Sequence, residues 1–348
     1  MVRRKVDYIL VGQGIAGTWL AHELIKRGKS IVVINHETEN TSSNKAAGLY
    51  NPITGRKMVK TWLSEELFLN LEDNYEELEK LVSAKFLHKM PIYRPFNTVE
   101  EKNDWEAKLG NPGYSNFVAE TKSHSMGFQN ISDDLGGILL KRTGYVDLRT
   151  LVISFREYLL DKGQYLSEMF DYKALEFVSD KIAYKDIEAD KVLFCEGPNL
   201  ENPFWNDLPF KLVRGELIDI ECDLPTNCIV NRGVFIIPKN GHHTVGSTYD
   251  HGHLSFEPQP EGIANIKQRL GKLFTGSYRI KSEHAGIRPA TFDRKPFVGL
   301  HPKKETLGIF NGFGTKGVSL TPYFATQFVD FLEGKTKIDT EADVQRVY

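Results

Sequence analysis

From Tyr8 to Gly17 the chain reads YILVGQGIAG, an apolar run followed by a glycine-rich turn. The first four residues predict a short strand that is buried on both faces. The glycines have GxGxxG spacing: Gly12 allows a tight turn, Gly14 lets a phosphate approach the backbone, and Gly17 lets a helix pack closely on the strand. Free N–H groups at the start of that helix then face the negative charge of a pyrophosphate. The stretch predicts dinucleotide binding, with a plain glycine turn as the alternative.

The residues after this turn complete one β-α-β unit. Ile15–Arg27 carries apolar residues at helical spacing, and Gly28 ends the helix. Ile31–Ile34 is a second buried strand, so we expect a parallel, right-handed unit. Asn35 follows, where an acidic residue usually holds a ribose hydroxyl; asparagine can bond a hydroxyl without a charge. Glu37 is either a substitute for that acid or an exposed loop glutamate.

Length and composition are those of an ordinary globular protein. The 348 residues are enough for two domains, with 41% hydrophobic and 26% charged residues. The formal net charge of −2 gives no overall attraction for nucleic acid or for an anionic membrane. The three cysteines form no CxxC pair, which favours free thiols in a reducing compartment. The sequence has no apolar run long enough to span a membrane and no signal peptide, so we expect a soluble, cytoplasmic enzyme.

Helical and strand patterns alternate along the rest of the chain. The spacing predicts helices over Leu63–Val82, over Leu148–Leu160 with Asp147 as N-cap, and over Pro322–Glu333. Leu212–Thr248 has the short runs and turns of an antiparallel sheet. An α/β part and an antiparallel part are therefore interleaved rather than divided once.

Two motifs near the C-terminus offer polar groups to a ligand. In Gly286–Thr291 (GIRPAT), Arg288 stands before a proline and presents a planar fork suited to a carboxylate; a surface ion pair is the alternative. In Asn311–Val318 (NGFGTKGV), three glycines expose backbone N–H groups at a helix start, and Lys316 adds a cation. This second motif suits a carbonyl or a developing negative charge, unless it is a helix-entry turn without a ligand.

Two other segments are less specific. Thr41–Pro52 (TSSNKAAGLYNP) has small residues that let the chain run against a large flat ligand, or it is merely a flexible loop. Four histidines surround an expected hairpin, where HxH spacing suits a metal and solvated side chains are the common alternative. They are His242, His243, His251 and His253. We expect solvated histidines and no metal site.

Nine motifs follow one another along nearly the whole chain. They are VGQGIAG (11–17), SSNKAAGLYNP (42–52), GYVD (144–147), VLFCEG (192–197), VRGEL (213–217), GVFIIPK (233–239), VGST (245–248), GIRPATFDRKPFVG (286–299) and NGFGTKGVSLTP (311–322). Their order resembles the FAD-dependent D-amino-acid oxidase superfamily. That group includes glycine oxidase, sarcosine oxidase and the oxidase half of the bifunctional tRNA-modifying enzyme that processes carboxymethylaminomethyl-uridine. The AAGLYNP form is most similar to the last of these.

The resemblance implies an α/β plus α+β fold, in which a Rossmann-type FAD-binding domain is joined to a second antiparallel-sheet substrate domain. The FAD-binding domain would comprise residues 1–85, 145–211 and 285–348, and the substrate domain residues 86–144 and 212–284. FAD would be held non-covalently, because the segments 286–293 and 311–317 have no cysteine for a thioether. The residues that the resemblance assigns to FAD are Gly12, Gly14, Ile15, Ala16, Gly17, Asn35, His36, Lys45, Ala46, Ala47, Gly48, Leu49, Gly197, Gly312, Gly314, Thr315, Lys316, Gly317 and Val318.

For the reaction, the resemblance implies oxidation of the C–N bond of a small amine or amino acid of the glycine, sarcosine or D-amino-acid type. Arg288 would pair with the substrate carboxylate, and hydride would pass from the α-carbon to flavin N5. Lys316 and the amides from Gly314 to Gly317 would meet the negative charge that the flavin gains. Two alternatives are an oxidase that acts on a carboxymethylaminomethyl group of tRNA and a flavin-binding protein without turnover. A NAD-dependent dehydrogenase would leave the C-terminal motifs without a purpose.

Four positions depart from the family pattern. Asn35 replaces the expected glutamate, and Glu196 stands where a small residue usually precedes Gly197. Thr244 occupies the place of the oxygen-activating lysine of sarcosine oxidase, which leaves the electron acceptor open. Phe235 stands where some relatives have a tyrosine hydroxyl, so polar contacts to the substrate are expected to differ.

Overall fold

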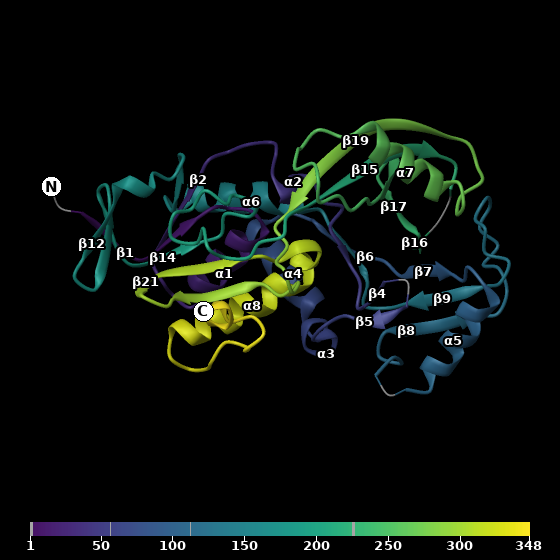
Figure 1. Cartoon of the computed structure of the whole chain (residues 1–348), viewed down its shortest axis with the longest axis horizontal. Coiled ribbons are helices and arrows are strands. Elements are labelled where there is room, and N and C mark those ends of the chain that lie inside the picture. Colours follow the sequence, from purple (N-terminus) through teal and green to yellow (C-terminus); the bar gives the residue numbers. More distant parts are fainter. Residues whose placement is uncertain (1–2, 56, 112, 225–226) are drawn as a thin grey trace.

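The first β-α-β unit lies in an eight-stranded sheet. The structure, a computed structural model, describes residues 3–55, 57–111, 113–224 and 227–348 (Figure 1). β1 (Arg4–Val11), α1 (Ile15–Lys26) and β2 (Ile31–Asn35) follow one another as predicted, and β1 pairs in parallel with β2. The strand order is β11-β2-β1-β14-β13-β12, and β21 pairs with β14 and with β20. The remaining strands are β11 (Tyr165–Ser167), β12 (Leu175–Val178), β13 (Lys181–Tyr184), β14 (Ile187–Phe194), β20 (Phe297–His301) and β21 (Lys304–Asn311).

The carboxyl ends of the central strands meet at one edge of this sheet. The pairs β1/β14, β1/β2 and β14/β21 are parallel. These strands end at Val11, Asn35, Phe194 and Asn311, and the glycine-rich segments of the sequence follow directly. In open α/β sheets a ligand binds at this edge. The topology therefore brings the predicted ligand segments to one place.

Three helices pack against this sheet, and a fourth, α4 (Leu71–Val82), packs against two of them. The three are α1, α6 (Leu148–Asp161) and α8 (Gly317–Leu332). α1 packs along α8 and contacts α6, and α4 contacts both α6 and α8. The Asp147 side chain accepts the Thr150 N–H at 3.1 Å, which confirms the predicted N-cap of α6.

α8 begins five residues earlier than predicted and contains Pro322 within its span. A proline inside a helix lacks the N–H that would bond the carbonyl four residues earlier. Here that carbonyl belongs to Val318, and it accepts a hydrogen bond from the Tyr75 hydroxyl at 2.9 Å instead. Because α4 satisfies the freed carbonyl, the helix continues through the proline.

The single helix predicted over Leu63–Val82 is wrong. The structure has a short α3 (Ser64–Leu67) and the longer α4, separated by Phe68–Asn70. Asn70 has φ −124° and ψ 16° at the start of α4, a non-helical geometry of the kind that asparagine favours before a helix. The apolar spacing runs through the break because Phe68 is buried as well.

The second sheet also has eight strands, and its order is β19-β15-β18-β17-β16-β7-β9-β8. Its pairs are antiparallel except for β16 with β7, so the predicted antiparallel sheet over Leu212–Thr248 is confirmed. The strands are β7 (Ile92–Pro95), β8 (Val118–Lys122), β9 (Gly137–Leu140), β15 (Val213–Cys222), β16 (Ile229–Arg232), β17 (Val234–Lys239), β18 (His242–Gly246) and β19 (Tyr278–Arg288). Its helices are α5 (Val99–Leu109) and α7 (Pro260–Leu270).

The two faces of the second sheet have different neighbours. On one face, Ile218 of β15 belongs to the same buried cluster as Ile263 and Ile266 of α7. On the other face, Leu217 of β15 and Ile237 of β17 belong to the large core that includes α1 and α8. We call this second face the inner face of the sheet. Figure 1 shows α2 (Ser42–Lys45) beside the end of β19, where the two sheets approach one another.

Short strands connect the two sheets. β3 (Leu49–Tyr50), β10 (Gly144–Val146) and β6 (Leu87–Lys89) form a three-stranded sheet, and β4 (Ile53–Thr54) pairs with β5 (Val59–Lys60). The stretch Thr41–Pro52 therefore contains α2 and β3 rather than loop alone. The predicted domain boundaries stay a prediction, and β19 passes through the one at residue 285 without a break. Among the described residues, the helices are too short or too polar to cross a membrane.

Candidate functional site

The glycine turn after β1 requires residues without a side chain. Gly12 has φ +95°, and a Cβ there would lie 2.5 Å from the Cys195 carbonyl oxygen. A Cβ on Gly17 would lie less than 3.0 Å from the Gly12 carbonyl oxygen, a distance that real Cβ atoms do not adopt. These two positions give the turn and the close helix packing that the sequence predicts.

The N-terminus of α1 is open to an anion. Gly14 is the N-cap and has no side chain to cap this helix, and the first turn of α1 contains no acidic residue. The Ile15 N–H donates to the Ser43 hydroxyl at 3.0 Å, so α2 closes one side of the turn. The remaining N–H groups of the first turn carry the positive end of the helix dipole. This geometry fits a pyrophosphate. Sequence reasoning missed Ser43, although it lies within the quoted Ser42–Pro52 motif.

Asn35 stabilises the glycine turn as well as ending β2. Its Oδ1 accepts the Gln13 N–H at 3.0 Å, and its Nδ2 donates to the Tyr165 hydroxyl at 3.0 Å. His36 is exposed, and the Glu37 carboxylate forms an ion pair with Arg156 at 2.6 Å. Both atoms of the Asn35 amide thus have one partner each, and a ribose hydroxyl could use the second lone pair of Oδ1 or the second N–H of Nδ2.

The segment from Lys45 to Leu49 passes between the two sheets. A Cβ on Gly286 of β19 would lie 3.0 Å from the Lys45 Cβ, and the Ser42 hydroxyl donates to the Ile287 carbonyl. Gly48 has φ +77° and packs directly on the backbone of β10, where its carbonyl accepts the Val146 N–H at 3.0 Å. Ala46 is exposed, Ala47 is buried and Leu49 is half-buried.

The C-terminal glycine motif joins the same edge. Asn311 Nδ2 donates to the Gly197 carbonyl at 2.9 Å, which ties the ends of β21 and β14 together. A Cβ on Gly317 would lie 3.5 Å from Ile15, so the N-termini of α8 and α1 are neighbours. The Gly314 N–H already donates to the Pro289 carbonyl at 3.1 Å. The N–H groups left for a ligand are therefore those at the start of α8.

Lys316 brings a half-buried positive charge to this edge. Burial lowers the pKa of its ammonium to about 8. None of the described residues forms an ion pair with it, and α8 has no side-chain cap at its N-terminus. Partial loss of water around a cation without a partner is unfavourable, and a ligand with negative charge would offset it. Gly312 (φ +84°), the exposed Thr315 and the buried Val318 complete the predicted segment.

Arg288 ends β19 on the inner face of the second sheet. Its guanidinium donates to the Thr248 carbonyl at 3.1 Å and to the Ser247 hydroxyl at 2.9 Å, and it lies over the Tyr249 ring at 4.7 Å. It covers Gly215, where a Cβ would lie less than 3.0 Å from the guanidinium. Burial lowers the pKa of Arg288, and no described carboxylate lies within ion-pair distance. The alternative of a surface ion pair is therefore wrong for the described residues.

Glu196, the departure noted before Gly197, is a buried carboxyl with three partners. It accepts hydrogen bonds from Asn202 at 2.6 Å, from Asn199 at 3.3 Å and from the Tyr172 hydroxyl. Burial raises the pKa of Glu196 to about 7, against the effect of these donors. The side chain stabilises the loop after β14 and does not reach the glycine motif at α8.

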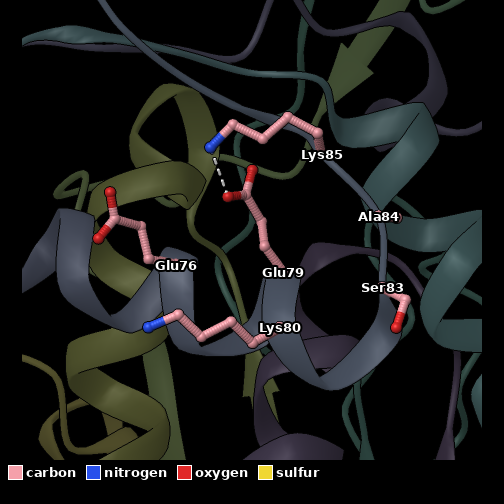
Figure 2. Close-up of a pocket in the computed structure, with 6 residues that line it drawn as sticks. All are labelled: Glu76, Glu79, Lys80, Ser83, Ala84 and Lys85. Atoms are coloured by element: carbon pink, nitrogen blue, oxygen red, sulfur yellow. Dashed lines mark hydrogen bonds and ion pairs between the residues drawn. The ribbon is translucent and has the colours of Figure 1, made fainter.

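A surface hollow lies at the C-terminal end of α4, away from every predicted site residue. Figure 2 shows its lining, with Glu79 bonded to the Lys85 ammonium at 2.7 Å. The Glu79 carboxylate also accepts the N–H groups of Phe86 and Leu87, at 2.7 and 2.5 Å. Because these contacts occupy the Glu79 carboxylate, Glu79 stabilises the end of the helix and is not free to react with a ligand in the hollow.

The four histidines of the hairpin region are dispersed. His243 contacts Cys222 and the Leu224 carbonyl, and His251 contacts the Leu212 carbonyl. Within residues 3–55, 57–111, 113–224 and 227–348, His, Cys, Asp and Glu side chains form no group of three that could hold a metal.

The inner face carries one polar cluster that sequence reasoning missed. Asp219 of β15 accepts hydrogen bonds from Thr244 at 2.7 Å, from Ser282 at 2.9 Å and from His284 at 2.7 Å. Although burial opposes ionisation, the hydrogen bonds from His284, Thr244 and Ser282 hold the pKa of Asp219 well below its usual range. Three strands contribute these residues, so only strand register brings them together. We call these four residues the Asp219 cluster.

The geometry fits a dinucleotide with a flat ring system. The glycine turn would hold a pyrophosphate, since the start of α8 lies beside the start of α1 and Lys45 lies against Gly286 of β19. Lys316 and the N-terminus of α8 are suited to the negative charge of a reduced ring.

Comparisons with known proteins agree with this geometry. Residues 7–330 match the family model described as FAD dependent oxidoreductase. The chain is 26% identical over 316 residues to the tRNA 5-methylaminomethyl-2-thiouridine biosynthesis bifunctional protein MnmC of Legionella pneumophila, which covers 84% of this chain and 45% of that protein. It is 21% identical over 354 residues to glycine oxidase of Bacillus licheniformis, which covers 96% and 94%. The chain thus spans less than half the length of the bifunctional relatives it matches.

Solved structures give the same fold. Glycine oxidase from Geobacillus kaustophilus superposes with a TM-score of 0.77 at 21% identity, over 97% of each chain. L-proline dehydrogenase from P. horikoshii superposes with a TM-score of 0.74 at 16% identity, over 99% of this chain and 98% of the other. The predicted Rossmann-type domain with a second, largely antiparallel sheet is confirmed. The chain belongs to the family of FAD dependent oxidoreductases.

Proposed function

We propose that this FAD-dependent oxidoreductase oxidises the C–N bond of a small amine that carries a carboxylate, such as glycine or an N-substituted glycine. The observation that carries the proposal is Arg288. It is a guanidinium held on the inner face by neutral oxygen atoms, with no described carboxylate as counter-ion. A substrate carboxylate is the partner that this fork lacks. Relatives whose names state glycine oxidase activity support the same substrate class.

The residues of the chain have separate tasks in this reaction. The glycine turn and the N-terminus of α1 hold the pyrophosphate of FAD, and FAD supplies the acceptor for the hydride from the substrate α-carbon. Arg288 binds the carboxylate and orients the α-carbon. Ser247 and Thr248 keep the guanidinium in place, because each accepts a hydrogen bond from it. Lys316 stabilises negative charge at the start of α8.

The Lys316→Met variant is expected to lower the two-electron midpoint potential of the bound flavin by about 30–60 mV. The loss corresponds to one charged interaction of ~1.5–3 kcal/mol with the reduced ring. The measurement is a spectroscopic redox titration with a reference dye. Lys335→Met changes an exposed lysine at the other end of α8, paired with Glu333, and serves as the control. An unchanged potential in Lys316→Met would contradict the assignment of this ammonium to the flavin.

Stability of the apoprotein gives a second measurement on Lys316. Burial lowers the pKa of Lys316 from 10.5 to about 8, so the unfolded chain binds more protons between these values. The apoprotein should therefore gain stability as pH rises from about 8 to about 10.5. The Lys316→Met apoprotein should lack that gain in urea unfolding.

The test of the proposed function begins with the visible spectrum of the purified protein. Anaerobic addition of glycine, sarcosine and other N-substituted glycines should bleach the flavin band, and the matching amines without a carboxylate should bleach it far more slowly. If none of these compounds reduces the flavin, the proposed reaction is wrong.

A second candidate is oxidation of a carboxymethylaminomethyl group on tRNA. The match to the tRNA-modifying bifunctional protein over 84% of this chain favours it. The net charge of −2 gives no overall attraction for the tRNA backbone. Salt-dependent retention of tRNA by the immobilised protein would support this candidate, and its absence at low salt would count against it.

A further inference from the structure

We propose that the Asp219 cluster is a second binding station, which takes a hydrogen-bond donor on the nitrogen substituent of the substrate. The proposal rests on the proposed function, because it assumes a carboxylate bound at Arg288. It narrows the substrate class to N-substituted glycines whose substituent ends in an uncharged donor such as a carboxamide.

Strand register puts the cluster on the same face as Arg288. In the pairing of β15 with β19, Arg288 is opposite Val213, Gly286 is opposite Gly215, and His284 is opposite Leu217. Side chains at alternate positions of a strand share a face. The Leu217 side chain belongs to the large core on the inner face. A Cβ added to Gly286 would lie against Lys45 on the same face. His284 therefore lies on the inner face, the face that Lys45 approaches at Gly286.

The spacing along β19 places His284 too far from the Arg288 guanidinium for a single small amino acid to contact both. The Arg288 guanidinium lies over Gly215, which is paired with Gly286. His284 is two residues further along the strand, about 7 Å at roughly 3.3 Å per residue. In glycine the carboxylate and the amine share one carbon, so glycine anchored at Arg288 cannot reach His284. A substituent on the nitrogen can extend along the strand towards it.

The hydrogen bonds of the cluster leave one acceptor open. His284 Nε2 lies 2.7 Å from the Asp219 carboxylate and 3.0 Å from the Ser282 hydroxyl. In the neutral form, an imidazole whose Nε2–H is held by a carboxylate presents Nδ1 as an acceptor. The His284 side chain keeps 34% of its surface exposed although it faces inward, and Asp219 keeps 15%. The cluster therefore has both a fixed orientation and access for a ligand.

Groups on both sides limit what the cluster accepts. His242 Nε2 lies 3.6 Å from Asp219, and the Lys239 ammonium lies over the Tyr145 ring at 5.2 Å. Burial lowers the pKa of Lys239, and this cation lies near the station. A charged substituent would lie near a like charge, either the Asp219 carboxylate or the Lys239 ammonium. A neutral polar group on the substituent is therefore favoured.

The test compares two probes of equal shape on the holoenzyme. N-(2-carbamoylethyl)glycine carries the donor, and N-(3-methylbutyl)glycine replaces the carboxamide with an apolar group of the same outline. Isothermal titration calorimetry on holoenzyme reduced beforehand with dithionite measures binding without turnover. One neutral hydrogen bond corresponds to about a 2- to 10-fold change in Kd. We expect the carboxamide to bind about fivefold more tightly in the wild type, and the two probes to bind equally in His284→Ala.

Two controls keep the test specific. His124→Ala changes an exposed histidine between β8 and β9 and should retain the fivefold difference. Sarcosine is too short to reach the cluster, so its Kd should be the same in His284→Ala and in the wild type. Equal affinity for both probes in the wild type, or a difference that survives in His284→Ala, would overturn the proposal. Flavin bleaching by the probes is measured separately, so a failure of the proposed reaction is distinguishable from a failure of this station.

Discussion

Gly17→Ala is expected to reduce the affinity for FAD at least about 100-fold, equivalent to ~3 kcal/mol. The added Cβ would lie less than 3.0 Å from the Gly12 carbonyl oxygen, so either α1 or the turn must move. The turn itself cannot yield easily, because Gly12 already packs against the Cys195 carbonyl. A displaced α1 no longer directs its N–H groups at the pyrophosphate.

The measurement is the ratio of flavin to protein absorbance after purification, followed by titration of the apoprotein with FAD. Gly28→Ala is the control, since Gly28 follows the same helix and has open space around the added Cβ, although its positive φ (+73°) is unfavourable for alanine. It should lose some stability and keep its FAD. A Gly17→Ala protein that purifies with a full complement of FAD would contradict the assignment of the glycine turn to the pyrophosphate.

Arg288→Ala is expected to lower kcat/KM for carboxylate substrates by about 10²–10³-fold, the effect of removing one partner of a buried charge pair (~3–4 kcal/mol). For the same amine without the carboxylate, kcat/KM should change little, because that compound never used the guanidinium. The Arg288→Lys variant keeps the charge but loses the planar fork, and an intermediate loss is expected.

The comparison of the two substrates separates binding of the carboxylate from damage to the sheet. The guanidinium also donates to the Thr248 carbonyl and to Ser247, so its removal loosens the end of β18. Such loosening would slow both substrates equally. An equal loss for both would therefore argue that Arg288 only stabilises the sheet.

The sequence predicts the glycine turn and its flanking elements well, because the spacing of residues close together in the chain determines them. The GxGxxG turn, the Asp147 N-cap and the buried strand β2 depend on residues that are neighbours in the chain. Gly17 is explained by its close approach to the carbonyl of Gly12, a near neighbour in the chain, whereas Gly12 packs on Cys195, which the pairing of β1 with β14 brings close.

Features that depend on distant contacts were not predictable. The start of α8 depends on a hydroxyl from α4, and the break before α4 leaves the apolar spacing intact. The Asp219 cluster combines residues from β15, β18 and β19, and single-residue slips in pairing would scatter them. Motif order assigns Arg288 to the site, but only the register gives its relation to His284.

The hydrogen bond from Tyr75 to Val318 makes two distant positions interdependent. If a related sequence has a residue with an N–H in place of Pro322, that N–H can bond the Val318 carbonyl and the Tyr75 hydroxyl is not needed. If it keeps the proline, loss of the Tyr75 hydroxyl leaves the Val318 carbonyl unsatisfied. Residues 75 and 322 should therefore change together in related sequences, although neither touches substrate. Lys316, the lysine that we propose to stabilise the reduced flavin, lies two residues before the Val318 carbonyl, so a change at position 75 or 322 is expected to shift the backbone that carries it.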